Sequence, residues 1–173
     1  METAQPSTVA ADLTENDAAH LRHAIALSWE ARENGRHPFG ALVVSGAGDV
    51  VVRTLNNFSG DEGGPTQHAE LVAVREAARL LPATELREAT LYTSAEPCAM
   101  CAGATYWCGI GRVVYALGED QLLQITGDHP ENPTLQLPCR VVFAAGQRPT
   151  EVVGPVLDDE AAAAHEGFWE RPA

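Results

Sequence analysis

The sequence of 173 residues contains no lysine, and its 11 basic residues are outnumbered by 24 acidic ones. The resulting net charge of −13 disfavours a nucleic-acid partner, because proteins hold a phosphate backbone mainly through Lys and Arg. The chain also lacks an apolar run of about 18 residues, so no membrane-spanning helix is predicted. We therefore expect a soluble protein with neither a membrane nor a nucleic-acid partner.

The N-terminus lacks the basic start and the apolar segment that are typical of a secretory signal. Residues 1–12 are expected to form a flexible tail, and residues 13–173 a single domain. Four cysteines are present, and two of them form a C-x-x-C pair. Without a sign of secretion, this pair favours metal or redox use in a reducing cytoplasm over disulfides.

Hydrophobic periodicity and turn residues predict an α/β fold. Thr14 and Asp17 resemble a capping box, which marks the start of the first helix. From Val50 onward strands and helices alternate, which predicts right-handed parallel crossovers. We expect a mixed sheet with helices on both of its faces. The predicted helices are Leu13–Asn34, Ala69–Leu81, Pro97–Cys108 and Ala161–Trp169, and the predicted strands are Ala41–Ser45, Val50–Leu55, Thr90–Thr93, Val113–Ala116 and Glu151–Val156.

The stretch Leu117–Gly146 fits more than one interpretation. Gly118–Ile125 favours a helix, whereas Arg140–Ala145 fits a strand or a helix, because periodicity does not separate the two for a short apolar run. His37 and His129 each stand alone in a loop-like context. We interpret both as surface residues.

Three metal-ligating residues fall at the starts of two predicted helices. His68 opens the second helix, and Cys98 and Cys101 open the third, with Pro97 at its first position. Residues at i and i+3 share a helix face, so both sulfurs can point to one spot. Helices that follow parallel strands start at the same end of a sheet, which brings His68 to that spot. One His and two Cys suit zinc, and a missing fourth protein ligand is typical of a catalytic site.

Glu70 lies two residues after His68, at the first turn of the same helix. A carboxylate beside a zinc-activated water can act as a general base and then as a general acid. The alternative is that Glu70 only complements the helix dipole. Cys108 is too far along its helix to share the metal with Cys101, at roughly 10 Å.

Thr66–Glu70, which reads T-Q-H-A-E, and Thr93–Cys101, which reads T-S-A-E-P-C-A-M-C, resemble the zinc-dependent cytidine deaminase superfamily. The resemblance covers roughly Leu13–Ala116. It implies a three-layer α/β/α fold with about five strands, Zn²⁺ bound by His68, Cys98 and Cys101, and proton transfer by Glu70. It also implies a homodimer, with possible exchange of a C-terminal helical tail that lies near the active site.

Two further stretches, Pro38–Ala41 and Cys101–Trp107, resemble the bacterial guanine and nucleoside deaminases. In that family the asparagine that ends the second strand binds the base, which implies this role for Asn56. The resemblance also implies an acidic residue that reads the purine, and Glu119, Asp120, Asp128 and Glu166 are all open. The other residues for which the resemblance implies a substrate contact are Phe39, Ala69, Glu96, Trp107, Phe168 and Trp169.

The resemblance implies hydrolytic deamination of a free nucleobase or nucleoside, with guanine, which would yield xanthine and ammonia, as the first expectation. Cytosine or cytidine is an alternative. Deamination of adenosine in tRNA is another, and the net charge of −13 argues against it. A deaminase fold with a purely structural zinc is the non-enzymatic alternative, and Glu70 argues against it, because a structural site needs no such carboxylate.

Overall fold

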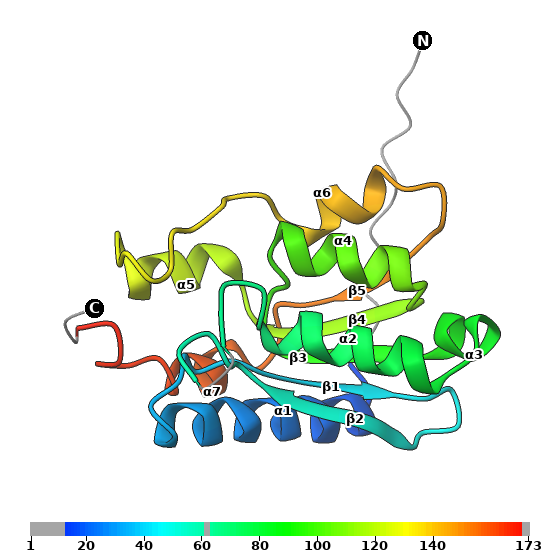
Figure 1. The fold of residues 1–173 in the computed structure, drawn as a ribbon, viewed down its shortest axis with the longest axis horizontal. Coiled ribbons are helices and arrows are strands. Elements are labelled where there is room, and N and C mark those ends of the chain that lie inside the picture. The colour runs from blue at the N-terminus through cyan, green and yellow to red at the C-terminus, as the bar shows by residue number, and fades with distance from the viewer. Residues whose placement is uncertain (1–12, 61–62, 171–173) are drawn as a thin grey trace, which may run out of the picture.

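The computed structural model describes residues 13–60 and 63–170, so the predicted tail at residues 1–12 lies outside the described residues. Within the described ranges, a five-stranded sheet has the order β2-β1-β3-β4-β5. Helices cover both of its faces (Figure 1). The mixed α/β architecture with about five strands is confirmed. No helix among the described residues is long and apolar enough to cross a membrane.

The first helix begins where its capping residues predict. In α1 (Glu15–Glu33) the Thr14 hydroxyl accepts a hydrogen bond from the Asp17 amide, and the Asp17 carboxylate accepts one from the Thr14 amide. These bonds satisfy two amides that have no partner within the helix. The helix ends at Glu33, and its C-cap Asn34 is followed by Gly35 with φ of 73°. Its apolar side covers one face of the sheet, packed on β1 and β3.

The sheet combines a hairpin with two neighbouring pairs of parallel strands. β1 (Gly40–Val44) pairs antiparallel with β2 (Val50–Leu55) and with β3 (Thr90–Ala95). β4 (Arg112–Leu117) and β5 (Glu151–Val153) follow in parallel. Alternate residues of β3 and β4 therefore enter two different cores, one beneath α1 and one beneath the helices of the opposite face.

Two helices on that opposite face start where the strands end. α2 (Ala69–Leu80) has His68 as its N-cap, and α4 (Ala99–Cys108) has Cys98 as its N-cap. The prediction that Pro97 occupies the first helical position is wrong, because Cys98 is still extended, with ψ of 168°. A short helix that was not predicted, α3 (Ala83–Glu88), follows α2.

The second half of the chain departs more from prediction. α5 (Glu119–Thr126) forms close to the expected range, and the ambiguous run near Arg140 is a helix, α6 (Cys139–Ala144). The expected helix over Ala161–Trp169 is wrong in position. α7 spans Asp158–Ala162, and turns carry the chain onward to Trp169, with Gly167 at φ of 66°. Gly167 lies beyond the end of α7, and its left-handed backbone prevents a helix from continuing to Trp169.

Candidate active site

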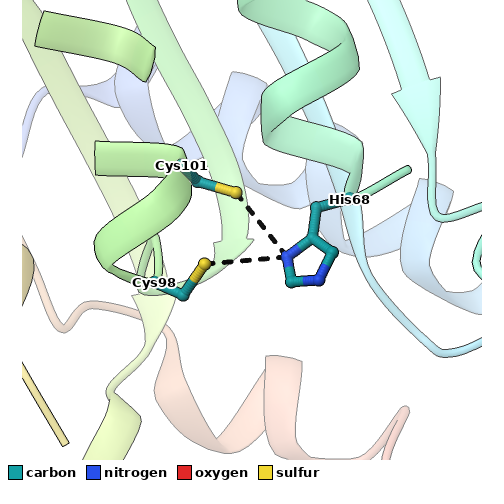
Figure 2. Close-up of side chains that lie close together, drawn as sticks. All are labelled: His68, Cys98 and Cys101. Carbon is teal, nitrogen blue, oxygen red and sulfur yellow. Dashed lines mark hydrogen bonds between the residues drawn. The ribbon is translucent and has the colours of Figure 1, made fainter. Parts of the chain in front are cut away.

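The three predicted metal ligands meet at the starts of α2 and α4. Figure 2 shows the His68 ring pointing between the two cysteine sulfurs. His68 Nδ1 lies 3.7 Å from Cys98 Sγ and 3.6 Å from Cys101 Sγ. All three potential ligand atoms lie within 4.8 Å of one another. The connection from β3 to α4 is short, whereas residues 56–68 between β2 and α2 form a longer loop. The Asn57 amide donates a hydrogen bond to the Gln67 carbonyl, which returns this loop to the end of β2 and brings His68 to the two cysteines.

This spacing fits a single zinc ion. Tetrahedral Zn–S and Zn–N bonds of about 2.3 and 2.05 Å place sulfur and nitrogen about 3.6 Å apart. The observed separations of 3.7 and 3.6 Å agree with that value. Within the described residues this is the group of metal-ligating side chains that gathers closely enough to hold an ion, and neither Cys108 nor Cys139 belongs to it.

The pKa values of the two thiols are shifted in opposite directions. A hydrogen bond from Cys101 lowers the pKa of Cys98 to about 4, and His68 contributes in the same direction. The same bond, together with burial, raises the pKa of Cys101 well above its usual value. Hydrogen bonding to Cys98 raises the pKa of His68. One sulfur is therefore a thiolate at neutral pH, the form that binds metal.

Glu70 is only 4% exposed and lies beside this cluster. Burial raises the pKa of its carboxyl to about 7, and the neighbouring His68 opposes that shift. A carboxyl group with a pKa near neutrality can both accept and release a proton at physiological pH. Its position at the first turn of α2 places it on the same cavity as the metal ligands.

A cavity of about 260 Å³ opens above these groups. This volume falls just below the usual range for ligand pockets, about 300–1,000 Å³. His68, Glu70 and Cys98 line it, together with three of the residues for which a substrate contact is predicted, Phe39, Asn56 and Glu96. Asn56 is 2% exposed, and its amide oxygen accepts a hydrogen bond from the Phe58 amide, which fixes the side chain against the wall.

Four other residues of that set do not line the cavity. Trp107 is 80% exposed and lies more than two turns beyond the start of α4. Ala69 is buried, and its carbonyl accepts a hydrogen bond from the Thr54 hydroxyl. Phe168 and Trp169 are also buried, in contact with the ring of His37. These two aromatic residues therefore support the wall from behind.

Glu96 lines the cavity, but backbone amides engage both of its carboxylate oxygens. Oε2 accepts a hydrogen bond from the Glu119 amide at 3.2 Å, and Oε1 accepts one from the Cys139 amide at 2.9 Å. These amides stand at the starts of α5 and α6. Glu96 thus ties two helices to the loop that carries Cys98.

The structure adds cavity residues that the sequence did not predict as such. His37 was expected at the surface, and that expectation is wrong: it is 4% exposed and lines the cavity. Its Nε2 is hydrogen-bonded to Glu131 Oε2 at 3.0 Å, and Glu131 also lines the cavity. No periodic pattern marks either residue, because both lie outside helices and strands. Of the acidic residues left open, Glu119 reaches the cavity, where burial raises its pKa to about 7.

The sequence is similar to a known protein family and to several of its members. Residues 14–117 match the family model for the cytidine and deoxycytidylate deaminase zinc-binding region. The chain is 42% identical to a probable cytosine deaminase of Schizosaccharomyces pombe over 161 residues, covering 92% of this chain and 96% of the relative. It is 40% identical to the guanine deaminase of Bacillus subtilis over 58% of this chain and 64% of that protein.

The fold is also similar to solved structures. The guanine deaminase of Nitrosomonas europaea superposes with a TM-score of 0.71 at 26% identity, covering 93% of this chain and 87% of that one. The match therefore extends beyond residues 14–117 into the segment that the sequence left ambiguous.

Proposed function

The chain belongs to the cytidine and deoxycytidylate deaminase family, whose members are zinc-dependent hydrolytic enzymes, and we propose that it deaminates a free nucleobase, guanine before others. The observation that carries this proposal is the placement of Glu70 beside the His68, Cys98 and Cys101 group, with Glu70, His68 and Cys98 lining one small cavity. That arrangement provides a metal site and a proton carrier at the same reacting centre.

His68, Cys98 and Cys101 would hold the zinc ion. When bound, zinc supplies a Lewis acid that makes water a nucleophile at neutral pH. Glu70 takes a proton from the attacking water and delivers it to the leaving amino group. The substrate carbon exchanges its bond to nitrogen for a bond to oxygen, and ammonia leaves. Asn56, held by its bond to Phe58, presents its amide to the base.

Guanine is supported by the similarity to two guanine deaminases, one of which shares the fold over 93% of this chain. Cytosine is the second candidate. It is favoured by the probable cytosine deaminase of S. pombe, which matches over 96% of its own length. Both bases carry an amino group on an amidine carbon, so one set of catalytic residues serves either.

The decisive experiment measures ammonia release by the zinc-loaded protein. Guanine, guanosine, cytosine, cytidine, adenine and adenosine would be supplied in parallel, with Glu70→Ala as the control. We expect guanine to react, with Glu70→Ala inactive on the same base. Activity on cytosine alone would replace guanine with the second candidate. No ammonia from any of the six would refute the proposed reaction.

We further propose a cytoplasmic homodimer. The support for the location is the reduced state required of the two ligand thiols. The ring centroids of Trp169 and His37 lie 5.0 Å apart within one chain. Exchange of the tail is therefore not needed to cover the cavity wall at His37. The mass of the protein in solution tests the dimer, and a monomer at all accessible concentrations would disprove it.

A further inference from the structure

The residues between β4 and α6 form one wall of the cavity. We define the lid as residues 119–138, which comprise α5 and the irregular segment that follows it. In Figure 1, α5 and the yellow segment after it lie above the red C-terminal segment. The lid residues that line the cavity are Glu119, Leu122, Glu131, Asn132, Pro133, Thr134 and Leu135.

Both ends of the lid are fixed to a single side chain. The Glu119 amide begins the lid and the Cys139 amide directly follows it, and each donates to one carboxylate oxygen of Glu96, at 3.2 and 2.9 Å. Bonds from backbone amides to an ionised carboxylate are among the stronger hydrogen bonds in proteins. The lid is therefore held at its base, next to the loop that carries the metal ligand Cys98.

The middle of the lid is attached to the opposite wall at His37. Glu131 Oε2 lies 3.0 Å from His37 Nε2. The His37 ring is held in place by two aromatic neighbours. Its centroid lies 4.8 Å from that of Phe58, on which it stacks, and 5.0 Å from that of Trp169. Glu131 itself is 37% exposed and stands in irregular backbone. The contact thus joins a fixed partner on the core to a less constrained partner on the lid.

We propose that the lid opens to admit substrate, that the His37–Glu131 hydrogen bond latches it shut, and that the latched lid restricts the site to free bases by excluding the ribose of a nucleoside. This inference rests on the proposed function for its substrate class. The cavity volume of about 260 Å³ supports the restriction, because it falls just below the range of about 300–1,000 Å³ that is usual for ligand pockets. Both His37 and Glu131 act as positioning residues.

Hydrogen exchange of the zinc-loaded protein without substrate tests the latch directly. Glu131→Gln removes the charge of the acceptor on the lid, and His37→Phe keeps an aromatic ring in the core but removes the donor. We expect amides of residues 127–138 to exchange about tenfold faster in each variant. The double variant should exchange no faster than either single one, because both changes break the same bond. Glu76→Gln, on the exposed side of α2, is the matched control and should not alter exchange in the lid.

Equilibrium binding tests the restriction without relying on turnover. In a Glu70→Gln background, guanine and guanosine would be titrated while fluorescence is recorded. Trp169 serves as reporter, since its ring lies 5.0 Å from His37 and 5.3 Å from His129 of the lid. We expect Glu131→Gln to raise the affinity for guanosine relative to guanine by about tenfold.

Three results separate the possible failures. Unchanged exchange in Glu131→Gln, or fully additive effects in the double variant, would overturn the latch. Weaker binding of guanine with unchanged exchange would instead make Glu131 a direct substrate contact, and would also overturn it. An unchanged preference for guanine over guanosine would overturn the restriction. Absence of ammonia release by the wild-type protein would contradict only the proposed function, because neither of these measurements depends on catalysis.

Discussion

Two buried carboxylates stand at opposite ends of the parallel strands and have opposite surroundings. Asp17 is 3% exposed and Glu70 is 4% exposed. The carboxylate of Asp17 accepts hydrogen bonds from Arg112 at 2.6 and 3.1 Å and from the Tyr92 hydroxyl at 2.7 Å. Burial tends to raise the pKa of Asp17, but these bonds and those from Thr14 outweigh it and hold the pKa below its usual range.

At Glu70 burial dominates and raises the pKa to about 7, although His68, a backbone hydrogen bond and the Thr93 side chain act in the opposite direction. The comparison shows that burial alone does not decide the ionisation of a carboxyl group, because a charged donor such as Arg112, together with other donors, can outweigh it. Asp17 joins α1 to the start of β4 and stabilises the fold. Glu70 is left with a proton that can be exchanged, which suits it for chemistry.

The largest effect should come from Glu70→Gln, which keeps the shape of the side chain but removes the proton carrier. We expect kcat to fall about 10³- to 10⁴-fold, because a general acid–base group contributes up to about that factor. Zinc content and the free energy of unfolding should not fall, since the variant relieves the burial of a carboxylate. Steady-state kinetics, metal analysis and chemical denaturation check these points. An active Glu70→Gln enzyme would remove Glu70 from the reaction.

Asp17→Asn should show the reverse pattern. It leaves the partly buried Arg112 guanidinium without its charged partner, and we expect the free energy of unfolding to fall by about 2–3 kcal/mol. That value lies below the figure for a fully buried pair, because the Arg112 side chain is 21% exposed. The kcat of the folded enzyme should be unchanged. A loss of kcat as large as that of Glu70→Gln would mean that the two carboxylates are not separate in function.

The dependence of stability on pH sharpens the comparison. The pKa of Asp17 is lower in the folded protein than its ordinary value of 3.8, so the unfolded state binds the proton more readily. The stability that Asp17 contributes is complete above that value and is lost as the pH falls below it. The contribution is at most about 1.4 kcal/mol per pH unit for one group. The free energy of unfolding, measured by chemical denaturation between about pH 4 and 2, should therefore depend less on pH in Asp17→Asn than in the wild type.

The smallest effect is expected at the surface. Glu160 pairs with Arg22 at 2.9 Å, but their side chains are 47% and 55% exposed. Exposed ion pairs are screened by water and salt and add little. Glu160→Gln should leave both the denaturation midpoint and kcat within experimental error. A marked loss of stability would show that the bond between α1 and α7 does more than its exposure indicates.

The sequence predicted the half of the site that depends on local signals. The H-A-E and P-C-A-M-C motifs sit where helices begin, and helix starts are marked by nearby residues, as at Thr14 and Asp17. The offset at Pro97 arose because the proline and Cys98 continue the extended chain before α4 turns. Boundaries of this kind depend on only one or two residues.

The other half depends on contacts between residues far apart in the chain. His37 lies against Phe58, Trp169 and Glu131, and no local pattern identifies such a partner set. Trp107 illustrates the opposite error, since an aromatic near the metal ligands in sequence lies on the outer face of its helix, 80% exposed. The position of a side chain around a helix decides its access to a site more than its distance along the chain does.

The two hydrogen bonds that the Glu96 carboxylate accepts have a consequence for how such an enzyme can evolve. The Glu119 and Cys139 amides, 20 residues apart in the chain, both bind the Glu96 carboxylate. The two ends of the lid are therefore held next to each other. The length and composition of the lid can thus vary without displacing the sheet or the loop that carries Cys98. Substitutions in the lid alone could therefore change the substrate, while the metal ligands and Glu70 stay the same.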